Sequence, residues 1–320
     1  MIKVQNLTRT FGPKVAVNDV SFGVERGEIL GFLGPNGAGK STTMRMITGF
    51  FPPTAGRITV GGHDVVEEPI AAKRLIGYLP ENAPSYTDMT VWQFLNFAAE
   101  LRGLHGPARK QAAERVIDTC FLNAVVHQSV DTLSKGYRHR LCFAQSIIHD
   151  PQVLVMDEPT DGLDPNQKHE VRNLIRRMGE KKAIIFSTHI LEEVEAVCTR
   201  AIIIDRGAIV ASGTPDELKS RADGAGVVVL RVSGQSGDTV RKAIEELAAV
   251  KRAAVVTSDA ASTLFRVYPR GREHNGALRS AIADLVARER WRVEELRAEE
   301  GRLDEVFRSI TMPDTSAASR

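Results

Sequence analysis

A glycine-rich segment constrains this chain more than any other feature. It follows the spacing G-x-x-x-x-G-K-[ST] and consists of Gly34, Pro35, Asn36, Gly37, Ala38, Gly39, Lys40, Ser41 and Thr42. An apolar stretch, Glu28–Leu33, precedes it, and a helical pattern, Thr42–Ile47, follows it. Strand, loop and helix in this order favour a phosphate site, because glycines let backbone N–H groups turn inward and the helix N-terminus adds a positive dipole. We expect Lys40 to reach the β- and γ-phosphates of a nucleotide and Ser41 to bind Mg²⁺.

A second motif joins four apolar residues to two acids. Val153–Met156 predicts a buried strand that ends at Asp157 and is followed by Glu158. At a strand end Asp157 is placed to hold Mg²⁺, and Glu158 is placed to orient or deprotonate an attacking water. Alone, the pattern also describes a strand that enters a turn. The glycine-rich segment is what gives it weight.

A third motif, Leu133–Arg138, stands just before a predicted helix. Gly136 and the helix N-terminus are suited to an anion. Ser134 is suited to capping the helix, which is the simpler interpretation from local chemistry.

The first two thirds of the chain alternate strands and helices. Apolar runs at Val153–Met156 and Ala183–Phe186 flank a predicted helix over 165–179. Strand, helix and strand at this spacing predict a parallel sheet covered by helices. Helical patterns over about 90–149 predict a helical region, and Ala201–Val210 predicts a hairpin.

A change of composition over 221–226 predicts a linker. The segment 225–311 then shows strand, helix, two strands, helix and strand, the order of a ferredoxin-like α+β unit, followed by a last helix. The tail 312–320 is small and polar, so we expect it to be disordered. The predicted domains are therefore 1–220 and 225–311.

Composition excludes several classes. The 42% hydrophobic and 26% charged residues fit a folded globular protein, and the net charge of +2 argues against nucleic acid as a partner. The three cysteines, Cys120, Cys142 and Cys198, include no C-x-x-C pair, so we expect no disulfide. No stretch reaches the ~18 apolar residues of a membrane span. We therefore expect any membrane part to come from a partner.

Together the motifs resemble the ATP-binding subunit of a bacterial ABC transporter, with 1–220 similar to its nucleotide-binding domain. Gly34–Thr42 resembles the Walker A motif, and Val153–Asp157 resembles Walker B. Glu158 then corresponds to the catalytic carboxylate, and Leu133–Tyr137 resembles the signature LSGGQ. The resemblance implies an α/β P-loop NTPase fold: a RecA-like parallel sheet core with an antiparallel β subdomain and a helical subdomain.

Three weaker sites take their interpretation from the resemblance. Gly162–Asp164 resembles the D-loop, which makes Asp164 an expected ATP-binding residue. His189 resembles the switch histidine that contacts the γ-phosphate, and Phe11 resembles the aromatic residue that stacks on adenine. As isolated residues, Phe11 would be read as core packing and His189 as an ordinary histidine.

Two departures stand out. The signature has Lys135 and Tyr137 where the family has Gly and Gln, and the Q-loop position is Glu81 instead of Gln. A carboxylate at Glu81 is still able to ligate Mg²⁺. These features resemble a subgroup that energises exporter-type membrane subunits, including gliding-motility, copper/nitrous-oxide-reductase maturation and drug-export ATPases.

The resemblance implies a head-to-tail homodimer, with each ATP between Lys40 of one chain and Ser134 and Gly136 of the other. It implies that Lys40, Glu158 and His189 are catalytic, and that Ser41, Asp157 and Glu81 bind Mg²⁺. The expected partners are membrane permease subunits at the cytoplasmic face of the inner membrane. The alternative is a soluble ATPase of this type that acts as a mechanical or regulatory module without a permease.

Overall fold

The computed structural model divides the chain into two compact units, Met1–Thr214 and Pro215–Arg320. It describes residues 1–81, 85–222, 224–259, 261–271, 277–299 and 301–311. The predicted tail 312–320 lies outside the described residues.

The boundary between the units lies before the predicted domain end at 220. Helix α8 (Pro215–Lys219) accounts for the difference, because it contacts α11 (Leu303–Ile310) near the other end of the second unit. Such a contact between distant segments leaves no local sign in the sequence.

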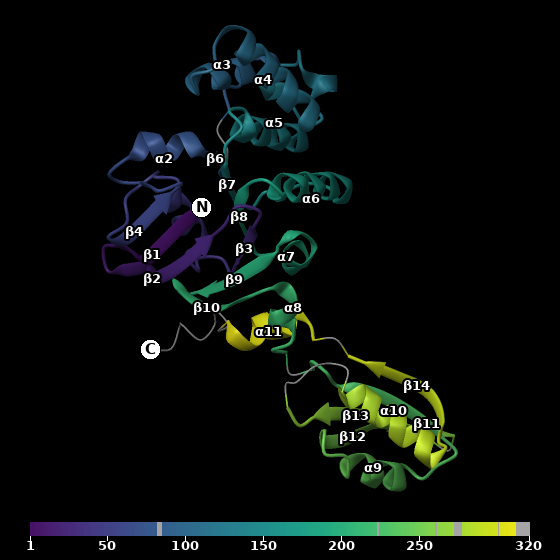
Figure 1. Ribbon diagram of the computed structural model, residues 1–320. Coiled ribbons are helices and arrows are strands. Elements are labelled where there is room, and N and C mark those ends of the chain that lie inside the picture. Colours follow the sequence, from purple (N-terminus) through teal and green to yellow (C-terminus); the bar gives the residue numbers. More distant parts are fainter. Residues whose placement is uncertain (82–84, 223, 260, 272–276, 300, 312–320) are drawn as a thin grey trace. The chain divides into compact units, whose positions relative to one another are not determined.

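Six strands within the described residues form the central sheet of the first unit, in the order β10-β9-β3-β8-β7-β6 (Figure 1). All neighbours pair in parallel except β9 and β10, which form the predicted hairpin. Strands β3, β7 and β8 are buried along their whole length, as expected for strands covered on both faces. The strands are β3 (Ile29–Leu33), β6 (Ile76–Leu79), β7 (Val153–Asp157), β8 (Ala183–Thr188), β9 (Arg200–Asp205) and β10 (Ala208–Gly213).

Helices pack on both faces of this sheet. Alternate residues of β7 enter different cores: Val155 packs with Met44 of α1, whereas Leu154 packs with Leu174 of α6. This alternation follows from the two-residue period of a strand. The helices are α1 (Lys40–Ile47), α2 (Pro69–Leu75), α6 (Pro165–Gly179) and α7 (Leu191–Val197).

A second, antiparallel sheet has the order β2-β1-β4-β5. Its inward residues, such as Leu7, Val20 and Ile58, share one core with Phe32 of the central sheet. The strands are β1 (Ile2–Phe11), β2 (Lys14–Val24), β4 (Ala55–Val60) and β5 (His63–Asp64).

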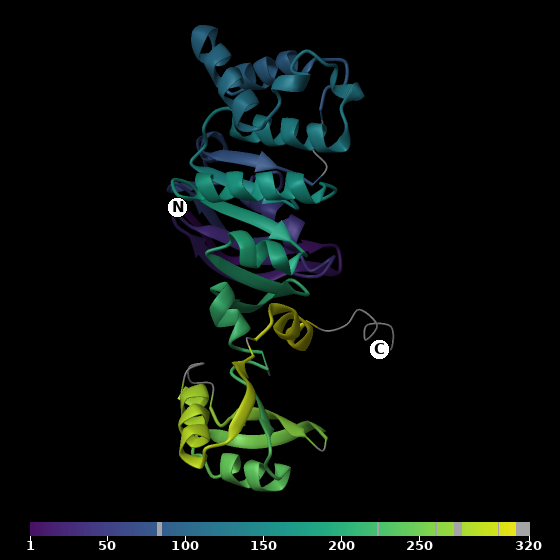
Figure 2. The same cartoon turned by 90° about the vertical axis from the view of Figure 1, so that its right-hand side faces the viewer.

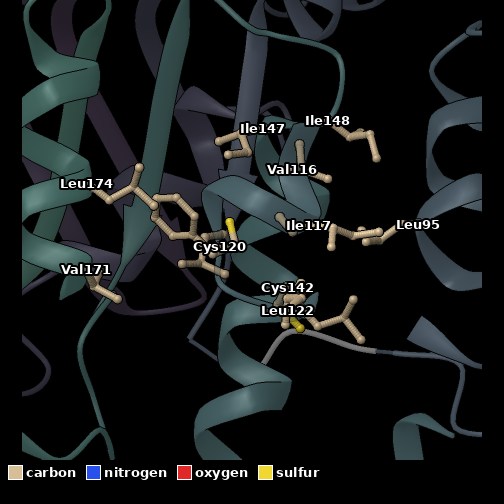
Figure 3. Packing of buried hydrophobic residues seen from close by; sticks show 14 of the residues in the cluster. Leu95, Val116, Ile117, Cys120, Leu122, Cys142, Ile147, Ile148, Val171 and Leu174 are labelled. Atoms are coloured by element: carbon tan, nitrogen blue, oxygen red, sulfur yellow. The ribbon is translucent and has the colours of Figure 1, made fainter. Parts of the chain in front are cut away.

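Three helices form the helical part of this unit, grouped apart from its strands in Figures 1 and 2. A capping box starts the first of them: the Thr90 hydroxyl accepts from Gln93 N, and the Gln93 side chain accepts from Thr90 N. Figure 3 shows their apolar side chains gathered with Val171 and Leu174 of α6, which joins the helical part to the central sheet. The helices are α3 (Val91–Leu101), α4 (Gly106–Thr119) and α5 (Lys135–Ile147), with short 3₁₀ turns at Asn123–Val125 and Val130–Thr132.

The second unit has the predicted order of strand, helix, two strands, helix and strand. Its sheet is antiparallel, in the order β12-β13-β11-β14. Alternate residues of β11, among them Leu230, pack with Phe265 and with Ile244 and Ile282 of the two helices. The elements are β11 (Val228–Ser233), α9 (Gly237–Glu245), β12 (Val250–Ser258), β13 (Ser262–Pro269), α10 (Ala277–Glu289) and β14 (Arg292–Ala298).

We predict that Phe265→Ala destabilises the second unit by about 3–5 kcal/mol, because it leaves a cavity in a core where Phe265 is 0% exposed. The two tryptophans of the chain report the units separately: Trp291 packs on this core, and Trp92 packs on the core of the helical part. Denaturant unfolding is followed by the fluorescence of Trp291 in a Trp92→Phe background. The exposed Val256→Ala is the control. An unchanged Trp291 transition in Phe265→Ala would contradict this packing.

Candidate functional site

The site is built where three parallel strands end side by side. Strand β3 pairs with β8, and β8 pairs with β7, so their carboxyl ends lie along one edge of the sheet. The register sets Leu33 opposite Thr188 and Asp157 opposite Ser187. Segments that are more than a hundred residues apart in sequence therefore meet at this edge, which is the usual ligand position in open α/β sheets.

The glycine-rich loop connects β3 to α1 through backbone that only glycine adopts easily. Gly39 has φ 107° and occupies the N-cap position of α1. A Cβ at Gly39 would come within 2.5 Å of the Ala16 carbonyl oxygen, and one at Gly34 within 2.4 Å of the Ile204 carbonyl oxygen. The loop is thus pressed against β2 and β9, which fixes the direction in which its N–H groups and Lys40 emerge.

Lys40 is the buried cation of the site, with a side chain only 6% exposed. Its Nζ donates to the carbonyl oxygens of Gly34 at 2.8 Å and Pro35 at 3.2 Å, and it lies 3.8 Å from Glu158 Oε1. Burial lowers the pKa of the Lys40 ammonium, while the carboxylates of Glu158 and Asp157 act to raise it. An ammonium held by neutral carbonyls at a buried site is well prepared to accept an anionic ligand.

Asp157 occupies the end of β7 and is 1% exposed. Its Oδ1 accepts hydrogen bonds from the hydroxyls of Ser41, at 3.1 Å, and Ser187. Its Oδ2 is buried and has no hydrogen-bond partner. A buried carboxylate oxygen without a partner is costly, so it marks a position where a further ligand is needed.

Glu158 follows in a left-handed backbone conformation, φ 51°, which turns its side chain out of the strand line. Its backbone N–H donates to Ser187 O at 3.1 Å, and its Oε2 lies 3.0 Å from His189 Nδ1. Burial raises the pKa of the Glu158 carboxyl, although the His189 hydrogen bond and Lys40 oppose the rise. The backbone strain and the shifted pKa both point to a functional carboxylate.

Lys40 and Glu158 line a cavity of about 480 Å³, whereas Asp157 does not line it but accepts a hydrogen bond from Ser41, which does. Of the predicted residues, those that line it are Phe11, Asn36, Gly37, Gly39, Lys40, Ser41, Thr42, Glu81, Glu158 and His189. The structure therefore brings together the adenine, phosphate and catalytic candidates from β1, the loop, α1 and the ends of β6, β7 and β8.

Six of the predicted nucleotide-binding residues do not line this cavity. Gly34, Pro35 and Ala38 belong to the loop but turn away from the cavity: the first two supply carbonyls to Lys40, and Ala38 is 3% exposed. The remaining three lie at the starts of α5 and α6.

At those helix starts the observed roles are local. Ser134 caps α5 by accepting from Tyr137 N at 3.3 Å, and Asp164 caps α6 by accepting from Gln167 N at 2.9 Å. Gly136 is buried beside α6, where a Cβ would come within 2.5 Å of Gln167 Oε1. The capping role expected for Ser134 from local chemistry is therefore present in the single chain.

Phe11 is 46% exposed, which leaves ring surface open for stacking. The Arg9 guanidinium lies 4.6 Å from its ring centroid, and the Phe51 ring contacts it edge-on at 5.8 Å. These contacts hold the ring at the cavity wall without burying it.

Sequence reasoning missed several residues of the site. Lys14, Ala16 and Asp161 also line the cavity, and Ser187 donates to Asp157. Asp161 also lies 3.4 Å from Lys135, the lysine that departs from the family signature. The only signal in the sequence was proximity: Lys14 is close to Phe11, and Asp161 to Glu158.

The described residues contain no group of three or more His, Cys, Asp or Glu side chains that would hold a metal ion by themselves. None of the described helices is long and apolar enough to cross a membrane.

Comparison with known proteins identifies the family. The ABC transporter family matches residues 17–161. The linearmycin resistance ATP-binding protein of Bacillus subtilis is 39% identical over 236 residues, 73% of this chain and 76% of that protein. The daunorubicin resistance ATP-binding protein of Streptomyces coeruleorubidus is 37% identical over 241 residues, 75% of this chain and 76% of that protein.

Among solved structures, a dimeric bacterial ABC transporter cassette matches with a TM-score of 0.63 at 21% identity, covering 67% of this chain and 99% of that one. At this identity the match speaks for the fold of the first unit. With the phosphate loop, the acidic strand end and His189 gathered at one cavity, and with relatives that match over three quarters of their length, the chain belongs to the ATP-binding proteins of ABC transporters and is an ATPase.

Proposed function

We propose that the chain binds and hydrolyses ATP at the cavity described above and thereby powers a separate membrane permease. The observation that carries this proposal is the meeting of Lys40, Asp157, Glu158 and His189 at one edge of the sheet. Each belongs to a different part of the hydrolysis, and no single segment of the chain contains all four.

The phosphates of ATP belong on the loop and the start of α1. Backbone N–H groups of such a loop and helix start would donate to the phosphates, and Lys40 would exchange the carbonyls of Gly34 and Pro35 for phosphate oxygens. The exposed ring of Phe11 is placed to stack on adenine.

Mg²⁺ fits the residues around the unpartnered Asp157 Oδ2. Ser41 Oγ donates a hydrogen bond to the same carboxylate, and both Ser41 and Glu81 line the cavity. These oxygens suit Mg²⁺, which keeps waters and phosphate oxygens among its ligands instead of requiring a cage of side chains. When bound, Mg²⁺ would neutralise charge on the transferred phosphoryl group.

Glu158 is the proposed general base. Its pKa, raised by burial, makes it a better proton acceptor for water than an ordinary carboxylate. His189 holds Glu158 Oε2 through Nδ1 and, being half-exposed at the cavity, is free to contact the γ-phosphate with its other nitrogen. The contact with Glu158 therefore fixes the orientation of the His189 ring at the cavity.

The proposed working form is a head-to-tail homodimer. Ser134, Gly136 and Asp164 lie outside the chain's own cavity, at the starts of α5 and α6. A helix start that carries a capping serine and a glycine is suited to a phosphate. A second chain that presents these helix starts to the cavity would complete each ATP site.

The proposed partner is an integral membrane permease at the cytoplasmic face of the inner membrane, and the proposed direction is export. The relatives in Bacillus and Streptomyces are resistance ATP-binding proteins, which supports this direction. Glu81 at the cavity wall would connect hydrolysis to the permease. The net charge of +2 supports a protein partner and not a nucleic acid.

Affinity purification tests the proposed assembly. Tagged chain carrying Glu158→Gln is isolated with ATP from detergent-solubilised native membranes, and its partners are identified. A polytopic membrane protein at about equal copy number would support the permease role. Recovery only in the soluble fraction, or with a soluble complex, would favour the ATPase module without a permease.

We predict that Glu158→Gln lowers the hydrolysis rate by about 10²–10⁴-fold, because the general base is lost, while ATP binding persists. Phosphate release and nucleotide titration measure the two effects. The matched control is Glu180→Gln, at an exposed position. We also expect ATP to trap the Glu158→Gln chain as a dimer. Hydrolysis at the wild-type rate in this variant would show that Glu158 is not the general base.

The raised pKa of Glu158 gives this prediction a pH dependence. Hydrolysis needs the ionised carboxylate, so the rate should fall on acidification, beginning at a higher pH than an ordinary glutamate would give. The residual activity of Glu158→Gln should lack this acidic limb. If the rate of the variant still falls on acidification, another group causes the pH dependence.

We predict that Lys40→Ala weakens ATP binding by about 10–100-fold, the effect of losing charge-assisted hydrogen bonds at a buried site. Equilibrium binding of a fluorescent ATP analogue measures it. Lys181→Ala removes the same charge at an exposed position and should bind as the wild type does. Equal affinities in the two variants would count against the phosphate loop.

We predict that Asp157→Asn weakens divalent cation binding in the presence of ATP by about tenfold or more. Mn²⁺ in place of Mg²⁺ allows the bound fraction to be read by electron paramagnetic resonance. Asp284→Asn, exposed in the second unit, is the control. Unaltered Mn²⁺ affinity would place the cation elsewhere.

A further inference from the structure

One buried carboxylate lies outside the cavity and has no role in the steps above. Glu193 belongs to α7 and is 1% exposed. A buried glutamate lowers the stability of the fold unless its oxygens accept hydrogen bonds or pair with a cation. The partners of Glu193 therefore indicate what it does.

Both oxygens of Glu193 receive hydrogen bonds from buried threonines. Thr160 Oγ1 donates to Oε1, and Thr188 Oγ1 donates to Oε2 at 2.8 Å. The two threonines are 3% and 0% exposed. Arg172 of α6 lies 3.8 Å from Oε1 and offsets the charge.

These threonines stand next to the two proposed catalytic side chains. Thr160 comes two residues after Glu158, and Thr188 comes directly before His189. The segments after β7 and β8 are therefore linked twice, which closes a ring of contacts. Glu193 links them through the two threonines, and at the cavity Glu158 Oε2 lies 3.0 Å from His189 Nδ1.

We infer that Glu193 is a positioning residue for ATP hydrolysis, which holds the segments after β7 and β8 in the register that the Glu158–His189 pair requires. The inference rests on the roles proposed above for Glu158 and His189. Neither Glu193 nor the threonines line the cavity, so the effect passes through the backbone of the two segments.

The ring requires two acceptor oxygens at this position. Thr188 Oγ1 already accepts from Ile190 N at 3.0 Å, so its single proton must go to Glu193. Thr160 directs its proton to the other oxygen. A glutamine has only one acceptor oxygen, so Glu193→Gln would break one of the two bonds.

The test compares Glu193→Gln with the wild-type full chain at a concentration that permits dimerisation. We expect kcat to fall by about 10–100-fold, the effect of displacing reacting groups by about an ångström, with ATP affinity within about threefold of wild type. Glu192→Gln removes the same charge from the exposed side of α7 and should leave kcat unchanged. A wild-type kcat in Glu193→Gln, or a loss confined to ATP affinity, would overturn the inference.

A double-mutant cycle separates positioning from general damage. In a His189→Ala background Glu193→Gln should cost much less than in the wild type, because the pair it serves is already broken. Additive losses would overturn the inference. If Glu193→Gln does not fold, Thr160→Val and Thr160→Ser replace it: loss of kcat in the first and retention in the second are expected, and equal activities would contradict the ring.

If the wild-type chain hydrolyses no ATP, the proposed function is refuted. The positioning role of Glu193 is then tested by a measurement that does not depend on hydrolysis. The ¹⁵N shifts of the His189 ring report its contact with Glu158 in the nucleotide-free chain. We expect them to move in Glu193→Gln and not in Glu192→Gln. Unchanged shifts in Glu193→Gln would overturn the inference by themselves.

Discussion

The parallel pairing of β3, β8 and β7 is the constraint on which the rest of the site depends. These strands are buried on both faces, so their register is fixed by two cores at once. A slip of one residue would exchange the cores and turn Asp157 away from Ser41. The register of the strands that carry the site is therefore set by apolar residues that line no part of the cavity.

The buried charged side chains at the strand edge have partners within the site. Lys40 is buried beside Glu158, and Asp157 is buried beside two hydroxyls. The same atoms would bind the ligands: Lys40 Nζ would bind phosphate, and the Asp157 carboxylate would bind Mg²⁺. On ligand binding, charged phosphate oxygens would replace the neutral carbonyls that now accept from Lys40, and charge-assisted hydrogen bonds are the stronger kind.

The sequence predicted the parts of the site that are contiguous in the chain. The loop from Gly34 to Thr42 lies directly between its strand and its helix in the chain, so spacing alone predicted a phosphate site there. Asp157 and Glu158 were found because an apolar strand leads directly to them. The central sheet, the helical part and the order of elements in the second unit were predicted for the same reason, since each depends on local periodicity.

What the sequence did not predict depends on contacts between distant segments. Lys14 and Asp161 reach the cavity only through the approach of a hairpin and of the segment after β7. The sequence does not distinguish Glu193 from the other acidic residues of α7, because its burial depends on how α7 packs against the sheet. Helix α8 contacts α11, over eighty residues further on, and no local pattern in the sequence indicates that contact.

In the proposed site ATP lies on Lys40, with Mg²⁺ at Ser41 and Asp157. An experimental structure of the full-length Glu158→Gln chain with ATP and Mg²⁺ tests it most directly. We expect Lys40 Nζ to have left the carbonyls of Gly34 and Pro35 for the phosphates, with Mg²⁺ density beside Ser41 Oγ and Asp157 Oδ2. Nucleotide bound elsewhere, or Lys40 still on those carbonyls beside a bound nucleotide, would contradict the assignment.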